Sequence, residues 1–217
     1  MRVLVACEYS GTVRDAFNRA GHYAMSCDLL PCESQASGDH YMGDVRDILD
    51  HDWDLMIAHP PCTYLCSSGL HWNKRVPGRQ ALTDEALDFI RVLLGAPIPR
   101  IALENPVGCI SSQIRRPDQI IQPYQFGDDA SKQTCLWLKG LPLLVQTNRV
   151  AGRMVTTPSG KVVERWSNQC DNYGQDKTPP SADRWKIRST TYKGIAEAMA
   201  NQWGDQTVCV NMNLTLI

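Results

Sequence analysis

Two short apolar segments of this sequence each end in a side chain that is able to do covalent chemistry. Residues 55–58 lead through a Pro-Pro pair to the thiol of Cys62, and residues 101–103 lead directly to the carboxyl group of Glu104, 42 residues further on. A thiol beside a carboxyl group suits a pyrimidine ring, because carbon 5 of that ring is a weak nucleophile until covalent addition breaks its aromaticity. The sequence therefore indicates covalent chemistry on a nucleobase.

These two side chains meet if the segments before them are neighbouring parallel strands. Such strands lie about 4.8 Å apart, and a helical crossover brings their ends to the same edge of a sheet. The intervening sequence supplies that helix through apolar residues at helical spacing, namely Leu82, Ala86, Phe89, Ile90 and Leu93. Residues 62–80, rich in Ser, Gly, His and Arg, are expected to form a long loop before it.

Strand and helix patterns alternate along most of the chain. The expected elements are strands at residues 3–6, 24–28 and 55–58, weaker strands at 120–126 and 134–138, and helices at 13–20 and 195–203. This order predicts an α/β fold with a doubly wound, largely parallel, Rossmann-like sheet. Gly and Pro punctuate residues 140–181, which are predicted to be irregular.

The noteworthy polar residues fall where the expected strands end. They are residues 8–11, Asp28, Asp44, residues 60–62 and residues 104–106. In doubly wound sheets, ligands bind outside the carboxyl ends of the strands. The agreement among these positions predicts one binding site along that edge of the sheet.

Length and composition indicate an ordinary globular protein. The 217 residues suffice for one sizeable core, and no apolar run approaches the ~18 residues of a membrane span. The first residues run straight into a strand pattern without a signal peptide, so we expect a cytoplasmic protein with no membrane partner. The nine cysteines lack paired short spacings, which favours a reducing compartment over a disulfide framework.

Positive charge is concentrated late in the chain, although the net charge is −1. Residues 130–188 contain ten Lys or Arg and four Asp or Glu, together with four aromatic residues, Trp137, Trp166, Tyr173 and Trp185. Cations interleaved with aromatic rings are typical of segments that hold a phosphate backbone and unstacked bases. A plain solvated surface would give the same composition.

Taken with these positions, the chain resembles the cytosine-5 DNA methyltransferases, specifically the short kind found in bacteriophages and prophages. The resemblance covers most of residues 2–204 and rests on Pro60-Pro61-Cys62, which matches the Pro-Cys nucleophile motif, and on Glu104-Asn105-Pro106, which matches Glu-Asn-Val. It implies a methyltransferase sheet, S-adenosyl-L-methionine as cofactor, DNA as partner with the target base flipped out, no metal, and the cytoplasm of a bacterial host.

The resemblance also implies roles for the catalytic residues. Cys62 would add to carbon 6 of cytosine, Glu104 would hydrogen-bond ring nitrogen 3, and Asn105 would complete the motif. The family's Gln-x-Arg-x-Arg element is missing, and Lys132, the nearest cation, would take the place of its arginine at the base O2. On residue type alone, Cys62 could instead be a buried cysteine, and Glu104 an acid at a helix start.

By the same resemblance, the cofactor would lie along the early strand ends and beside the last helix. The residues expected to hold it are Glu8, Tyr9, Ser10, Gly11, Thr12, Val13, Asp28, Leu29, Asp44, Val45, Pro60, Ser189 and Thr190. Residues 8–13 resemble the family's glycine-rich loop, although Gly11 is their one glycine. Asp28 and Asp44 stand where the ribose and adenine contacts are expected.

The DNA would be held by an insert and by a loop. Residues 1–140 and 182–204 would form the catalytic domain, 141–181 a small target-recognition insert and 205–217 a tail. A mobile loop at residues 69–79 would close over the flipped base. The residues expected to contact DNA are Pro61, Trp72, Lys74, Arg75, Arg153 and Arg165.

Three other functions were weighed. A zinc cytidine deaminase needs His-x-Glu and Pro-Cys-x-x-Cys, whereas this chain has no His-x-Glu and places Cys66 one residue too far after Cys62. Modification of a free pyrimidine nucleotide by the same chemistry stays open, with the basic segment as a phosphate clamp. So does a non-catalytic DNA-binding protein of the same fold, because the arginine element is missing.

Overall fold

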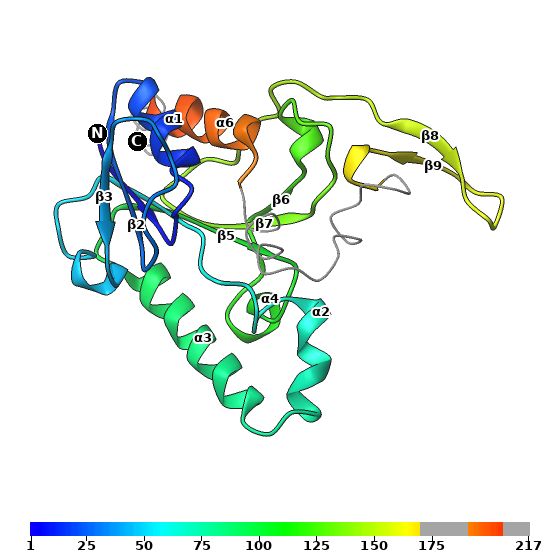
Figure 1. The fold of residues 1–217 in the computed structure, drawn as a ribbon, viewed down its shortest axis with the longest axis horizontal. Helices are drawn as coiled ribbons and strands as arrows, with labels where there is room; N and C mark the ends of the chain where they lie inside the picture. Colours follow the sequence, from blue (N-terminus) through cyan, green and yellow to red (C-terminus); the bar gives the residue numbers. More distant parts are fainter. Residues whose placement is uncertain (170–190, 206–217) are drawn as a thin grey trace, which may run out of the picture.

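The protein is described from a computed structural model that covers residues 1–169 and 191–205. Its centre is a seven-stranded sheet with the order β3-β2-β1-β4-β5-β7-β6, drawn in Figure 1. The strands are β1 (Arg2–Ala6), β2 (Tyr23–Asp28), β3 (Asp39–Met42), β4 (Leu55–Ala58), β5 (Arg100–Pro106), β6 (Gln119–Ile121) and β7 (Thr134–Lys139). Among them β7 runs antiparallel to both of its neighbours, and the other pairings are parallel.

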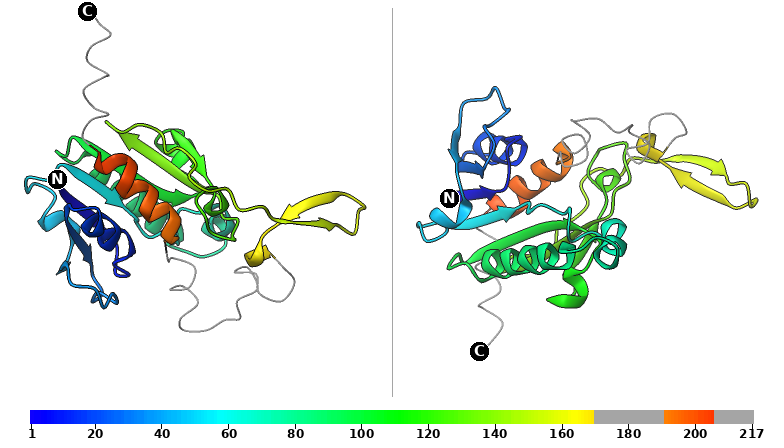
Figure 2. Two further views of the ribbon diagram at one scale, coloured as in Figure 1. Left: turned by 90° about the horizontal axis from the view of Figure 1, so that it is seen from above. Right: turned by 60° about the horizontal axis from the view of Figure 1, so that its bottom comes forward.

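Helices cover both faces of this sheet (Figures 1 and 2). The longer ones are α1 (Thr12–Arg19), α3 (Arg79–Gly95) and α6 (Lys193–Gly204); the shorter ones are α2 (Ser67–Leu70), α4 (Ile110–Gln113) and the 3-10 turns η1 (Val45–Asp47), η2 (His71–Lys74), η3 (Pro123–Gln125) and η4 (Ser167–Gln169). Helices α1 and α6 pack together on one face, and α3 covers the other. The sheet is therefore the middle layer of three.

The central strands are buried on both faces, as parallel strands in such a sandwich must be. Val3 and Val5 of β1 point toward α1 and α6, whereas Leu4 and Ala6 point toward α3. Strand β4 alternates in the same way, and all four of its residues are buried. This explains why the two strands read as continuous apolar runs in the sequence.

The structure confirms the predicted α/β class, the mostly parallel sheet and the pairing that the candidate chemistry requires. Strands β4 and β5 are parallel neighbours, with Leu55 opposite Arg100 and Ala58 opposite Leu103. The chain crosses from one to the other through α3, so that both strands end at one edge. The strand order reverses between β1 and β4, which is the position where doubly wound sheets bind ligands.

Several local expectations were wrong. Edge strand β3 was missed because residues 39–42 carry no apolar alternation, and residues 62–80 contain α2 and η2 where a long loop was expected. Of the expected strand at 120–126, residues 119–121 form β6 and 123–125 form a 3-10 turn. The expected irregular insert contains a hairpin of β8 (Arg153–Thr156) and β9 (Val162–Arg165), whose strand β8 is exposed throughout and so lacks a buried apolar face.

Gly11 begins α1 with φ 70°, a left-handed conformation that other residues adopt at a cost. A Cβ there would lie 2.6 Å from Cβ of Ser34. We expect Gly11→Ala to lower the free energy of unfolding by about 3 kcal/mol, through conformational strain and overpacking together. Denaturant unfolding measures the loss.

The matched control is Gly21→Ala, which has a φ of 86° and no heavy atom within 4 Å of the added Cβ. It carries the conformational strain alone, and we expect a loss of about 1 kcal/mol. Equal losses for the two variants would contradict a packing role for Gly11.

Within the residues that the structure describes, no helix has both the length and the apolar character needed to cross a bilayer.

Candidate active site

The segment that carries Cys62 leaves the end of β4 and is tied to the end of β5. The buried amide of Asn105 donates a hydrogen bond from Nδ2 to the carbonyl oxygen of Pro60 at 2.8 Å. This bond joins the two motifs that the sequence singled out. Asn105 therefore acts on the loop backbone, which makes it a positioning residue for Cys62.

Three further contacts hold the backbone after Cys62. A guanidinium nitrogen of Arg79 donates to the carbonyl of Thr63 at 3.2 Å, and the hydroxyl of Thr83 donates to the carbonyl of Tyr64 at 3.1 Å. The N–H of Cys109 donates to the carbonyl of Leu65 at 2.9 Å. Residues 60–65 are thus fixed by β5, by α3 and by the segment before α4, so the position of the thiol is preorganised.

The thiol of Cys62 is paired with that of Cys66. The pKa of Cys62 is raised well above its usual range by its hydrogen bond to Cys66, by burial and by the negative charges of Cys66 and Glu104. The pKa of Cys66 is lowered by the same hydrogen bond and by that from Ser68, whose Oγ lies 3.3 Å from the sulfur. The shared hydrogen bond therefore moves the two pKa values in opposite directions, that of Cys62 upward and that of Cys66 downward.

This pairing predicts how the two thiols react. Cys66→Ala removes the largest cause of the raised pKa of Cys62, so we expect Cys62 to react with iodoacetamide at a lower pH than in the unchanged protein. Short alkylation pulses across a pH series, followed by peptide mass spectrometry, measure the shift. The control is Ser68→Ala, which removes another hydrogen-bond partner of Cys66 and should move the pH profile of Cys62 alkylation little. If Cys66→Ala also leaves that profile unchanged, the pairing of the two thiols is contradicted.

Glu104 lies beside His59 and near Lys132. The imidazole Nδ1 of His59 is 3.3 Å from Oε2 of Glu104. Burial by itself would raise the pKa of Glu104, but the hydrogen bond and charge of His59, the charge of Lys132 and a hydrogen bond from Thr134 outweigh it and lower that pKa. Glu104 is therefore a buried carboxylate.

Lys132 joins the group from the loop before β7. Its positive charge favours the ionised form of both Cys62 and Glu104. It adds to the lowering of the Glu104 pKa and offsets part of the rise in the Cys62 pKa. Its Nζ lies 6.0 Å from the ring centroid of Tyr192. The structure thus brings together the thiol, the carboxylate and the cation that the sequence proposed.

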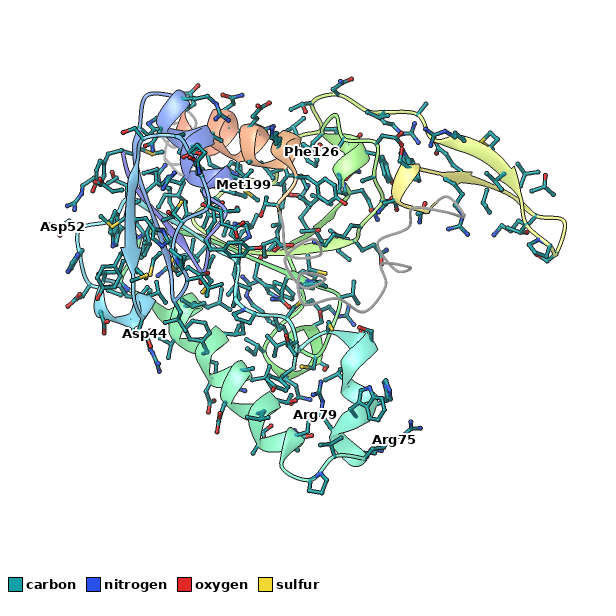
Figure 3. The ribbon with its side chains drawn as sticks, viewed as in Figure 1. Asp44, Asp52, Arg75, Arg79, Phe126 and Met199 are labelled. Atoms are coloured by element: carbon teal, nitrogen blue, oxygen red, sulfur yellow. The ribbon has the colours of Figure 1, made fainter. Side chains whose placement is uncertain are left out.

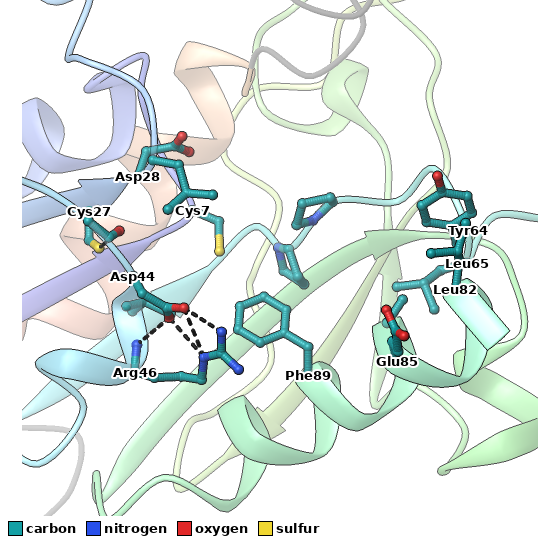
Figure 4. A pocket seen from close by; sticks show the side chains of 16 residues that line it. Cys7, Cys27, Asp28, Asp44, Arg46, Tyr64, Leu65, Leu82, Glu85 and Phe89 are labelled. Atoms are coloured by element: carbon teal, nitrogen blue, oxygen red, sulfur yellow. Dashed lines mark hydrogen bonds and ion pairs between the residues drawn. The ribbon is translucent and has the colours of Figure 1, made fainter.

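A cavity of about 440 Å³ lies at the ends of β1, β2 and β4 (Figure 4), and it is connected to the group through Pro60 and Pro61, which line it and directly precede Cys62. Its volume is in the usual range for a small-molecule site. The predicted cofactor residues that line it are Asp28, Leu29, Asp44, Val45 and Pro60, and Pro61 lines it as well. The carboxylate of Asp44 pairs with the Arg46 side chain, which lowers the pKa of Asp44.

The loop after β1, at residues 7–13, contributes less to the cavity than expected. Cys7 lines the cavity, with a φ of 58° that is uncommon for a residue other than glycine. Residues 8–13 are not among the lining residues, although they were expected to hold the cofactor. The buried carboxylate of Glu8 instead accepts hydrogen bonds from the N–H groups of Val13 at 2.6 Å and Arg14 at 3.2 Å, so it caps α1. Ser189 and Thr190 lie outside the described residues.

The expected DNA-contacting side chains lie on two projections. Trp72, Lys74 and Arg75 are exposed on and beside η2, with the guanidinium of Arg75 5.7 Å from the Trp72 ring centroid. Arg75 lies on the outer side of this segment, away from the sheet (Figure 3). Arg153 and Arg165 lie opposite each other at the base of the β8–β9 hairpin, which extends away from the sheet (Figure 2).

Sequence reasoning missed several residues of the site. Arg79 was expected on a mobile loop over the flipped base rather than on the backbone beside Cys62, and neither Thr83 nor His59 was assigned a role. The position of His59 directly before the Pro-Pro pair was the available signal, and the four-residue spacing of Cys66 from Cys62 was another.

Comparisons with known proteins add no assignment. No model of a known protein family matches the chain, and no curated protein matches it. Among the described residues, no three His, Cys, Asp or Glu side chains are grouped so that they could hold a metal ion.

Proposed function

We propose that the protein methylates carbon 5 of cytosine in DNA, using S-adenosyl-L-methionine. The observation that carries this proposal is the convergence of Cys62, Glu104 and Lys132 at the ends of adjacent strands, next to a cavity lined by the carboxylates of Asp28 and Asp44. A nucleophile, a hydrogen-bonding acid and a cation are the three groups that activation of a cytosine ring requires.

The chain's own residues account for the activation step. As the sulfur of Cys62 forms a bond to carbon 6, its proton passes to the Cys66 thiolate. The electron pair of the C5=C6 bond becomes the C4=C5 bond, and the C4=N3 pair moves to ring nitrogen 3, which takes a proton through Glu104. Lys132 offers an N–H donor to the base O2. Carbon 5 is then nucleophilic, and later loss of its proton re-forms C5=C6 and expels the Cys62 sulfur.

The cavity fits the cofactor that this chemistry needs. Asp28 and Asp44 supply acceptors for hydroxyl and amino groups, while Phe89, Leu65 and Leu82 supply an apolar wall. When bound there, S-adenosyl-L-methionine would supply an electrophilic methyl group. Pro60 lines the same cavity and precedes Cys62 by two residues, so the cavity and the nucleophile share one segment.

DNA is the substrate that the two projections favour. Arg153 and Arg165 are directly opposed across the hairpin, a local concentration of positive charge. Asp129 offsets part of this charge through its ion pair with Arg153 at 3.1 Å. The exposed Trp72 and Arg75 offer a ring and a cation to an unstacked base and its phosphate.

The test is a labelling experiment with two substrates. The protein is incubated with tritiated S-adenosyl-L-methionine and either mixed-sequence DNA or cytidine monophosphate, and the products are digested to nucleosides. Label in 5-methylcytosine from DNA supports the proposal. Label only from the mononucleotide, or DNA binding without any transfer, would overturn it in favour of a nucleotide-modifying enzyme or a non-catalytic DNA-binding protein.

A further inference from the structure

His59 occupies the point where the three central strands end side by side. Its backbone N–H donates to the carbonyl of Ala6 at 2.9 Å, so the residue stays in line with β1 as well as β4. Its side chain is 10% exposed and faces Glu104 from β5. On the β1 side lies Glu8, whose pKa is raised by burial and lowered in part by the charge of His59. The imidazole is therefore located between two buried carboxyl groups.

The proposed function leaves one proton unaccounted for at this place. Ring nitrogen 3 needs a proton as carbon 6 is attacked, but Glu104 is a carboxylate and has none to give. The partner within hydrogen-bond distance is Nδ1 of His59, at 3.3 Å from Oε2. An imidazole is the side chain best able to supply and recover a proton near neutral pH.

On the basis of the proposed function, we infer that His59 is the proton store of the site, donating from Nδ1 to Glu104 and thereby protonating the pyrimidine ring at nitrogen 3. This role is distinct from those of Cys62, Glu104 and Lys132, and it makes His59 a positioning and proton-supplying partner of Glu104.

The proton transfer balances in both directions. Glu104, a carboxylate at the outset, takes the Nδ1 proton of His59 and passes that same proton to nitrogen 3 as the C4=N3 electron pair moves onto it. The products of the step are an N3–H ring, a Glu104 carboxylate and a neutral His59. When the C4=N3 bond re-forms, the same proton returns along the same path, so no outside acid is consumed.

The surroundings of His59 favour a group that can change its charge. Glu8 and Glu104 face it from β1 and β5, Lys132 approaches from the loop before β7, and Tyr192 from the segment before α6. The imidazole thus has acidic groups on two sides and a cation on a third. Within the described residues, the buried Nε2 has no hydrogen-bond partner, so the ring is oriented by its contact with Glu104.

The kinetic test uses His59→Gln, which keeps an amide donor near Glu104 but cannot carry a proton. We expect kcat for methyl transfer to fall by about 100-fold with little change in KM for DNA, the scale typical of a lost proton donor. The alkaline limb of the pH profile of kcat, which reports deprotonation of His59, should disappear. An unchanged kcat with an unchanged pH profile would overturn the inference.

Thr134→Val is the matched control, because it removes another hydrogen bond to Glu104 without removing a titratable group. It should lower kcat and keep the alkaline limb. Loss of the limb in this variant as well would overturn the assignment to His59. If the unchanged protein transfers no methyl group at all, the proposed function fails instead, so the two failures are distinguishable.

A second measurement keeps His59 in place and so covers the case in which His59→Gln does not fold. Nitrogen-15 NMR of histidine-labelled protein reports protonation at each ring nitrogen. We expect one of the five histidines to carry a proton at Nδ1 and to lose its distinctive shift in Glu104→Gln. No histidine signal that responds to Glu104→Gln would overturn the inference.

Discussion

Cys62→Ala is expected to abolish both methyl transfer and covalent capture of DNA. The substitution removes the sulfur that must bond carbon 6, and the neighbouring Cys66 leaves the backbone four residues further on, where it is hydrogen-bonded to Ser68. We expect a loss on the order of 10⁴-fold or more in kcat, as for other covalent nucleophiles. Radiolabel transfer measures the rate, and DNA that contains 5-fluorocytosine captures the adduct on a denaturing gel.

The control for this prediction is Cys32→Ala. Cys32 lies in the loop between β2 and β3, where its sulfur is 3.3 Å from a guanidinium nitrogen of Arg14. We expect this variant to retain transfer and adduct formation. Equal activity of Cys62→Ala and the unchanged protein would refute the assigned nucleophile.

Gly108→Ala is expected to have the second-largest effect, although Gly108 touches no reacting atom. A Cβ at this position would lie 2.0 Å from the carbonyl oxygen of Leu65 and 2.9 Å from Cα of Cys66. Both are backbone atoms, so the added methyl group must push the segment that carries Cys62 out of place. We expect a loss of about 3 kcal/mol in the free energy of unfolding, the upper end for overpacking.

Activity should fall in this variant even under conditions where it is fully folded. A displacement of about 1 Å at a catalytic group costs on the order of 100-fold in rate, and the N–H of Cys109 would lose its bond to Leu65. Kinetics at a temperature where the variant is fully folded separate the two effects. The control is Gly95→Ala, where nothing lies within 4 Å of the added Cβ, and it should change neither the rate nor the stability. Full activity in folded Gly108→Ala would show that the close approach of Gly108 to the Leu65 backbone does not position Cys62.

The parts of the fold that the sequence predicted correctly are those with a strong apolar period. Strands β1 and β4 are continuous apolar runs, and α1, α3 and α6 carry apolar residues at helical spacing. The positions of these elements and the pairing of β4 with β5 could therefore be predicted. Edge strand β3 and hairpin β8–β9 bury too little surface to leave such a pattern. The reversed direction of β7 was not predictable either, because side-chain alternation is the same in a parallel and an antiparallel strand.

The candidate site was predictable to the same extent. Cys62 and Glu104 could be placed together because Cys62 comes shortly after β4 and Glu104 lies near the end of β5, its parallel neighbour. The contacts of Arg79 with Thr63 and of Asn105 with Pro60 join residues 16 and 45 positions apart. Such contacts depend on how α3 and β5 dock, which no local pattern in the sequence specifies.

The base of the hairpin is attached to the loop that carries Lys132. Trp166, at the end of the β8–β9 hairpin, stacks on Tyr124 with ring centroids 3.9 Å apart, and Asn168 forms reciprocal hydrogen bonds with the backbone of Ser131, the residue before Lys132. If the hairpin binds DNA as proposed, we expect this attachment to link binding at the hairpin to the position of the Lys132 ammonium group.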